Sequence, residues 1–173
     1  EQARLDSPAA WSRFHLEALE RLRALPGVQS VGLVENVPLN EGTAASRART
    51  QDMGASAAEG QVINITYSAG DYFRSMGISL VSGREFTAQD HAGSGALIVS
   101  RAAAERLWPG RDPLGQRLQR EGREDWETVV GVVENVLQDN FWSPPEPLIY
   151  LPLMAPSSGP SWTVTTPAYV IKT

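Results

Sequence analysis

The apolar residues of this chain come in short runs that glycine and proline interrupt, and this pattern constrains the fold more than any other feature. The longest nearly unbroken apolar run, residues 129–133, contains Gly131 at its centre. A membrane-spanning helix needs about 20 apolar residues, so no stretch of this sequence has the length of a span. Runs this short predict many short strands and a few helices, joined by frequent turns.

The first 27 residues carry the clearest helical pattern. Ser7 and Pro8 are typical of a helix start, and Pro26 with Gly27 is typical of a helix end. Between them, apolar residues recur at three- and four-residue steps and predict one apolar stripe: Trp11, Phe14, Ala18, Leu19, Leu22 and Leu25. We expect a strand over residues 28–37 directly after this helix.

The rest of the chain predicts an α+β fold. A second helix follows the capping residue Ser100 and ends at Trp108, and a short helix is predicted over residues 70–76. Short strands are predicted at residues 62–67, 78–81, 96–99, 115–118, 127–136, 148–153 and 168–171. Residues 38–60 show no periodicity, and we expect them to form a mobile segment, either a long loop or an ordered excursion with little core of its own.

Charge and composition exclude several classes of function. The chain has 15 Lys and Arg against 20 Asp and Glu, a net charge of −5, and lacks the basic footprint of a nucleic-acid-binding protein. It has no cysteine, which excludes disulfides, thiolate zinc sites and iron–sulfur clusters. Residue 1 is Glu rather than Met, so we expect a processed product or a fragment of a longer protein.

Several segments together resemble one known family. They are LRALPGV (22–28), DYFRSMGI (71–78), GREFT (83–87), AERLWPG (104–110), DPLGQRL (112–118) and VVGVV (129–133). In this order and spacing they resemble the extracytoplasmic (periplasmic) core domain of MacB-like, FtsX-like ABC transporter permeases. The resemblance spans about residues 8–153 and the terminal strand.

The resemblance implies a two-lobed fold. A porter-like α/β lobe is formed by the chain ends, residues 1–69 and 128–173, and a smaller α+β lobe, residues 70–127, is inserted in it. It also implies a location on the outer side of the cytoplasmic membrane, between two membrane segments of the parent protein. We expect the lobes to tilt against each other near residues 67–70 and 126–129.

The same resemblance implies a function and partners. The domain would be non-catalytic and would couple motion driven by a cytoplasmic ATPase to transport or extraction outside the membrane. Its partners would be a second permease, in a homodimer or pseudo-dimer, the ATPase subunit and a periplasmic adaptor, with no nucleic acid. A stand-alone periplasmic ligand-binding or sensor module is the alternative.

The residues that mark the family are turn and packing residues such as Gly83 and Trp108, which specify a shape rather than a reaction. We therefore expect no catalytic residue, no cofactor and no metal site, and we interpret His15 and His91 as ordinary surface or boundary histidines. The nearest set of acids, Asp71, Glu85 and Asp90, would suit a small hydrolase only if their side chains converged in one cleft.

Two further groups of residues concern the surface. Trp142 and Trp162 lie in predicted loops, and exposed aromatic residues beside prolines are typical of partner surfaces. The two tryptophans are therefore candidates for a partner surface, with a position over the edge of the core as the alternative. The acidic residues Glu121, Glu124, Asp125 and Glu127 predict a solvated hairpin end.

Overall fold

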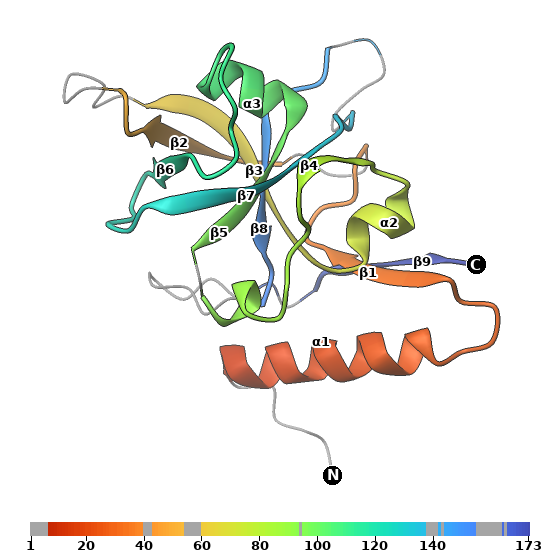
Figure 1. Cartoon of the computed structure of the whole chain (residues 1–173). Coiled ribbons are helices and arrows are strands. Elements are labelled where there is room, and N and C mark those ends of the chain that lie inside the picture. The colour runs from red at the N-terminus through yellow and green to blue at the C-terminus, as the bar shows by residue number, and fades with distance from the viewer. Residues whose placement is uncertain are drawn as a thin grey trace.

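The computed structural model describes residues 7–39, 43–53, 60–93, 95–137, 142, 144–154, 164 and 166–173 (Figure 1). Its helices are α1 (Pro8–Arg23), α2 (Tyr72–Met76) and α3 (Arg101–Leu107), with a 3-10 turn at Asp90–Ala92. Its strands are β1 (Ser30–Val34), β2 (Ala44–Thr50), β3 (Gln61–Gly70), β4 (Leu80–Gly83), β5 (Ala96–Ser100), β6 (Arg117–Arg120), β7 (Glu127–Val133), β8 (Leu148–Pro152) and β9 (Ala168–Lys172).

Six of these strands close into a ring. The order around the ring is β2, β6, β7, β5, β8 and β3, and β3 pairs back onto β2. The β3–β8 and β5–β7 pairs are parallel and the other four are antiparallel. Closure gives each of the six strands a neighbour on both sides, which removes most of the free edge of an open sheet.

Two long strands connect the ring to the rest of the sheet. The first half of β3 pairs with β2, and its last three residues pair with β1, which in turn pairs with β9. In the same way β7 pairs first with β6 and then with β4. The fold is therefore mixed α/β, with a few helices around one large sheet, as the sequence predicted at this level.

Strands from both of the predicted lobes take part in the same ring. β5 and β6 come from residues 70–127, whereas β2, β3, β7 and β8 come from the chain ends. The two predicted crossings, residues 67–70 and 126–129, lie in or beside strands that have neighbours on both sides. The described part of the sheet has no break at these positions, and the division into two lobes stays a prediction.

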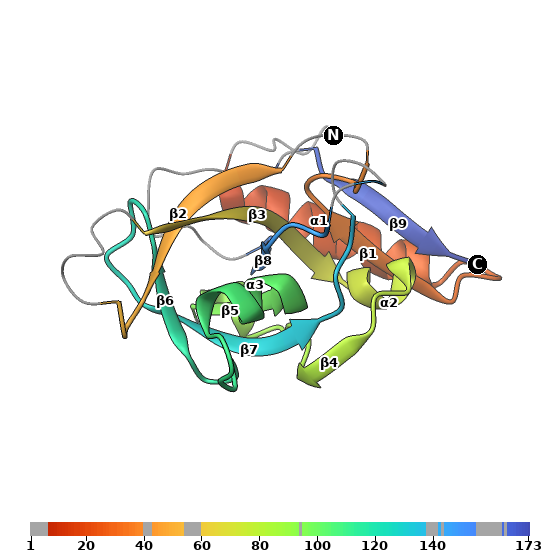
Figure 2. The same cartoon turned by 90° about the horizontal axis from the view of Figure 1, so that it is seen from above.

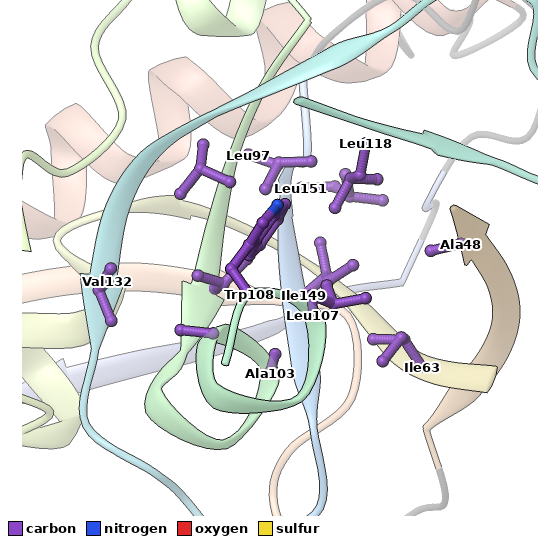
Figure 3. Close-up of a cluster of buried hydrophobic side chains, with 13 residues drawn as sticks. Ala48, Ile63, Leu97, Ala103, Leu107, Trp108, Leu118, Val132, Ile149 and Leu151 are labelled. Carbon is purple, nitrogen blue, oxygen red and sulfur yellow. The ribbon is translucent and has the colours of Figure 1, made fainter. Parts of the chain in front are cut away.

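The interior of the ring holds the largest apolar cluster. α3 lies within the outline of the strands when the molecule is seen from above (Figure 2), and Trp108, only 2% exposed, lies among the strand side chains (Figure 3). The cluster comprises Ala48, Ile63, Leu97, Val99, Ala103, Ala104, Leu107, Trp108, Leu118, Val129, Val132, Ile149 and Leu151. Every ring strand contributes at least one of these residues. α3 lies at one end of the ring (Figure 1), and its buried side chains and Trp108 fill the space that the strands enclose.

Ser100 fixes the position of α3 against the ring. Its hydroxyl oxygen accepts a hydrogen bond from the Ala103 amide at 3.2 Å, which caps the helix as the sequence predicted. The same oxygen accepts a second bond from the Leu148 amide at 3.0 Å, at the start of β8. One buried side chain therefore joins the last residue of β5, the start of α3 and the start of β8.

Two smaller clusters cover the outside of the sheet. α2 packs Tyr72 and Phe73 against Tyr150 of β8, with the Phe73 and Tyr150 ring centroids 4.9 Å apart. α1 packs Leu19 against Val31 and its neighbours on β1. The two helices therefore lie on opposite faces of β1, and all five residues of this strand are buried.

Of the two alternatives for residues 38–60, β2 favours an ordered excursion with little core of its own over a long loop. Only Ala48 and Thr50 are buried in this strand of small and polar residues, because most of its other side chains face solvent. The strand is held by antiparallel pairing with β3 on one side and β6 on the other. The pairing partners are distant in sequence, and the segment itself lacks the alternation of apolar and polar residues that predicts a strand.

Gly83 and Gly131 allow β4 and β7 to approach closely. Gly83 has φ +77°, and a Cβ atom there would lie 2.3 Å from the carbonyl oxygen of Val130. A Cβ atom on Gly131 would lie 2.3 Å from the carbonyl oxygen of Arg84. Neither site has room for a larger residue, which agrees with the structural role predicted for Gly83.

Replacing Trp108 by alanine tests the importance of the ring interior. Because a large ring would be deleted from a fully buried site, we expect Trp108→Ala to lower the free energy of unfolding by about 3–5 kcal/mol. Trp142→Ala, at a side chain that is 87% exposed, should change it by no more than about 0.5 kcal/mol. Urea unfolding followed by circular dichroism measures both, and equal midpoints for the two variants would contradict this view of the core.

Candidate functional site

The N-terminal helix and the C-terminal strand meet at one end of the sheet. β9 pairs with β1 along its whole length, and the amide of Gln29 donates to the carbonyl of Lys172 at 2.8 Å. α1 packs against β1 and Tyr169 of β9 (Figure 1). We call α1, β1 and β9 the terminal junction. A force on the N-terminal end would reach β1 through α1, and a force on the C-terminal end would reach it through β9.

The sequence of α1 explains how it joins this junction. Ser7 caps the helix by accepting a hydrogen bond from the Ala10 amide at 3.2 Å, and Pro8 occupies the first turn, as predicted. Leu19 is buried on the face that packs on β1. Phe14 and Leu25, which the periodicity places on the same apolar stripe, remain about half exposed. The buried stripe is therefore narrower than the sequence predicted.

His15 links α1 to β9 and corrects its interpretation as a surface or boundary residue. The side chain is buried, its Nδ1 atom lies 2.7 Å from the hydroxyl of Tyr169, and its ring stacks on Trp11 with centroids 5.7 Å apart. Burial lowers the pKa of His15, and the backbone of Val164 acts in the opposite direction. His15 is therefore a neutral packing and hydrogen-bonding residue near pH 7.

The three acids considered for a hydrolase are engaged separately. Asp90 is buried and accepts bonds from Arg84 at 2.6 and 3.2 Å, and from the amide and hydroxyl of Thr87 at 2.7 and 2.8 Å. Asp90 is therefore held in an ion pair and a turn. Asp71 stands at the N-cap position of α2, but its side chain forms an ion pair with Arg23 at 3.0 Å instead of capping the helix.

The protonation of Glu85 depends on its burial and on the charge of Asp71. Burial raises the pKa of Glu85 first, the charge of Asp71 adds to the rise, and Arg74 opposes it. Asp71 and Asp90 meanwhile bind arginines, so their lone pairs are engaged in ion pairs. Among the described residues, no group of three or more His, Cys, Asp or Glu side chains is arranged to hold a metal ion.

An ion pair that the sequence did not predict lies near one end of the ring. Arg120 on β6 donates two hydrogen bonds to Glu127 on β7, at 2.6 and 2.7 Å, and the side chains are only 10% and 5% exposed. Burial acts to lower the pKa of Arg120, but the bonds and charge of Glu127 outweigh it and raise the pKa. Glu127 is therefore not part of a solvated acidic hairpin end.

Two grooves open on the described surface of the ring. One, which we call the arginine groove, has a volume of about 220 Å³ where β2 meets β6, and Arg47, Arg49, Arg120 and Arg123 contribute to its lining. The other, of about 310 Å³, lies beside the end of α3. Sequence reasoning singled out neither groove, because each is assembled from segments far apart in the chain.

The predicted partner surface is described only in part. The Trp142 side chain is the most exposed large apolar side chain of the described residues, and it stands just before the prolines at 144 and 145. Trp162 lies outside the described residues. A partner surface at these positions stays a prediction.

Comparison with known sequences decides the family. The sequence model of the MacB-like periplasmic core domain matches residues 3–171. The chain belongs to this family. This MacB-like domain is accordingly an extracytoplasmic domain of an ABC transporter permease, as its sequence motifs suggested. No curated protein matches the chain significantly. In the described part of this MacB-like domain, every helix is too short or too polar to cross a membrane.

Solved structures support the fold of this MacB-like domain. The periplasmic region of MacB from Actinobacillus actinomycetemcomitans is 17% identical with a TM-score of 0.53, over 80% of this chain and 55% of that one. A domain described as belonging to a permease protein from Porphyromonas gingivalis is 17% identical with a TM-score of 0.54. The match covers 90% of this chain and 65% of that one.

A third structure is the extracellular domain of the noncanonic ABC-type transporter YknZ from Gram-positive bacteria. It is 22% identical with a TM-score of 0.49, over 79% of this chain and 60% of that one. The chain thus spans between 55% and 65% of the length of these three structures.

Breaking the buried ion pair tests how the end of the ring is held together. Glu127→Leu leaves the Arg120 guanidinium buried without its counterion, so we expect it to lower the free energy of unfolding by about 3–5 kcal/mol. The double variant Arg120→Met/Glu127→Leu should recover most of this loss, because it removes both charges. Glu134→Gln breaks the exposed pair between Glu134 and Arg101 and should lower the stability far less than Glu127→Leu, because solvent screens this pair. A loss in the double variant as large as in Glu127→Leu would contradict this explanation.

Glu35, just after β1, generates a pH-dependent prediction. Its Oε2 atom is buried without a hydrogen-bond partner in the described structure, and burial raises its pKa to about 7, against a smaller opposing effect of the Tyr67 backbone. The folded state therefore binds a proton more tightly than the unfolded state, whose carboxyl titrates near 4.5. The native protein accordingly loses stability as the pH rises from about 4.5 to 7.

Glu35→Gln removes this titration. We expect it to raise the melting temperature at pH 8 by about 2–4 °C, or about 1 kcal/mol after allowance for solvent access to a half-buried group, and to have little effect at pH 4.5. Glu20→Gln, at an exposed position on α1, serves as the control. Differential scanning calorimetry at both pH values measures the effect, and a gain that is the same at pH 4.5 and 8 would rule out titration of Glu35 as its cause.

Proposed function

We propose that this domain is a non-catalytic, rigid lever of an ABC transporter permease. Motion driven by a cytoplasmic ATPase would enter through membrane segments on either side of the domain and would be used for transport or extraction outside the membrane. The observation that carries this proposal is the terminal junction, where both ends of the chain are held against the same strand, β1.

The contacts of β1 support rigid transmission from the junction to the ring. β1 pairs with β3 through Gly32, Leu33 and Val34, and β3 is itself a ring strand. A Cβ atom on Gly32 would lie 2.3 Å from the Cα atom of Tyr72, so α2 rests directly on β1. Because β1 is fixed by β3, β9 and α2, it can shift only if hydrogen-bonded and close-packed neighbours shift with it.

The partners follow from the family and belong to the same proposal. A second permease would form a homodimer or pseudo-dimer with the parent protein, the ATPase subunit would act through the membrane segments, and a periplasmic adaptor would dock on the outer side. We propose Trp142 and Trp162 as contacts for such a partner. The Trp142 side chain is exposed, and an exposed tryptophan is typical of interface centres, whereas Trp162 lies outside the described residues and is proposed from the sequence alone. Nucleotide hydrolysis would be confined to the ATPase subunit.

The reading frame of the parent gene separates this function from the alternative. A hydropathy profile should show apolar segments of about 20 residues on both sides of the 173-residue domain. Their absence would contradict the permease role and favour a stand-alone ligand-binding or sensor module.

Loosening α1 tests whether the terminal junction transmits motion. In the complete permease with its ATPase, we expect Leu19→Ala to lower transport at least several-fold while nucleotide hydrolysis continues, since the truncated side chain weakens the packing of α1 on β1. Leu16→Ala is the matched control, because Leu16 lies on the same helix but is 50% exposed, whereas Leu19 is 2% exposed. Unchanged transport in a folded Leu19→Ala protein would show that the junction does not carry the motion.

A further inference from the structure

The arginine groove concentrates positive charge on an acidic protein. Its lining contains four arginines and one acid, Glu121, although the chain as a whole carries a net charge of −5. The other lining residues are Ala48, Gly60, Gln119 and Gly122. The two glycines present no side chain there, so the backbone and the guanidinium groups form much of the wall.

The charges of this groove are only partly compensated within the described structure. Arg120 is neutralised by Glu127. Arg49 donates from Nε to the side-chain oxygen of Gln119 at 2.7 Å, and a second bond runs from its Nη2 atom to the same oxygen. Gln119 is uncharged, so these bonds orient the guanidinium of Arg49 without cancelling its charge.

Arg123 is the residue that most requires a ligand. Its Nε atom is buried, and the described structure contains no hydrogen-bond partner for it and no ion pair of this side chain. A buried donor without a partner is costly, and the cost is removed when an acceptor binds. Guanidinium groups that share a groove also repel one another until an anion enters.

We infer that the arginine groove binds a phosphate-type oxyanion, with Arg123 and Arg49 as its principal donors. Arginine presents several N–H groups in a planar fork, which matches the oxygen atoms of phosphate. Phosphate suits the groove better than a single carboxylate, because its oxygen atoms can accept from both Arg49 and Arg123 while Arg120 stays paired with Glu127. The phosphate would belong either to a small soluble molecule or to a lipid headgroup, and both present the same atoms to the arginines.

Trp126 provides a local signal for binding. The guanidinium carbon of Arg49 lies 5.5 Å from the centroid of its ring, so an anion that draws on Arg49 should change the fluorescence of Trp126. Trp126→Phe identifies the part of the signal that comes from this residue, since the chain has five tryptophans.

Titration of the 173-residue chain with inorganic phosphate and pyrophosphate tests the inference. We expect a saturable fluorescence change and a higher melting temperature. Binding should be weakened at least tenfold in Arg123→Gln and also weakened in Arg49→Gln. The second variant keeps the test valid if Arg123→Gln does not fold. Arg13→Gln, on the exposed side of α1, should bind within twofold of the native chain. Lack of a saturable change, or native binding by both groove variants, would overturn the inference.

Vesicles distinguish the two sources of phosphate. Sedimentation with phosphatidylcholine vesicles that contain phosphatidic acid, compared with pure phosphatidylcholine, measures headgroup binding. Recruitment that is lost in Arg123→Gln would assign the groove to a lipid headgroup, and binding of free phosphate without recruitment would assign it to a soluble molecule. Because neither outcome depends on ATPase coupling, failure here would leave the lever function untouched, and failure of the lever function would leave the oxyanion site untouched.

Discussion

The packing of Trp108 and the buried side chains of α3 inside a closed ring of strands is the interaction on which the rest of this structure depends. The ring strands are short, between four and ten residues, and none buries enough apolar surface by itself. Closure gives every one of them two hydrogen-bonded neighbours, and the inserted indole fills the space they enclose. The terminal junction, the buried ion pair and the arginine groove are all attached to this ring.

The parts of the fold that the sequence predicted are those with strong local signals. α1 and α3 have capping serines and clear ends, β7 has a nearly continuous apolar run, and Gly83 has the positive φ that a tight turn requires. β2 was missed because its burial depends on pairing with β3 and β6 rather than on its own residues. Local patterns report local structure, and a ring is closed by contacts between distant segments.

The candidate sites also depend on contacts between distant segments, which local sequence patterns do not reveal. Glu127 was grouped with exposed acids because its neighbours in sequence are acidic, whereas its burial follows from Arg120 on the next strand. The arginine groove could not be predicted from the sequence, because its residues come from distant segments; Arg49 and Gln119, for example, are 70 positions apart. The family, by contrast, was recognisable from the sequence, because its motifs consist of turn and packing residues whose order along the chain is itself the signal.

The polar groups that hold the ring together differ from those of the arginine groove in whether they have partners. Each buried polar group that fixes the ring, such as Ser100 between α3 and β8, binds elements that are distant in sequence, so a displacement of β1 is resisted by the whole sheet. The acids that stiffen the molecule are engaged with arginines and contribute little free charge. The arginine groove differs because Arg123 lacks such a partner in the described structure.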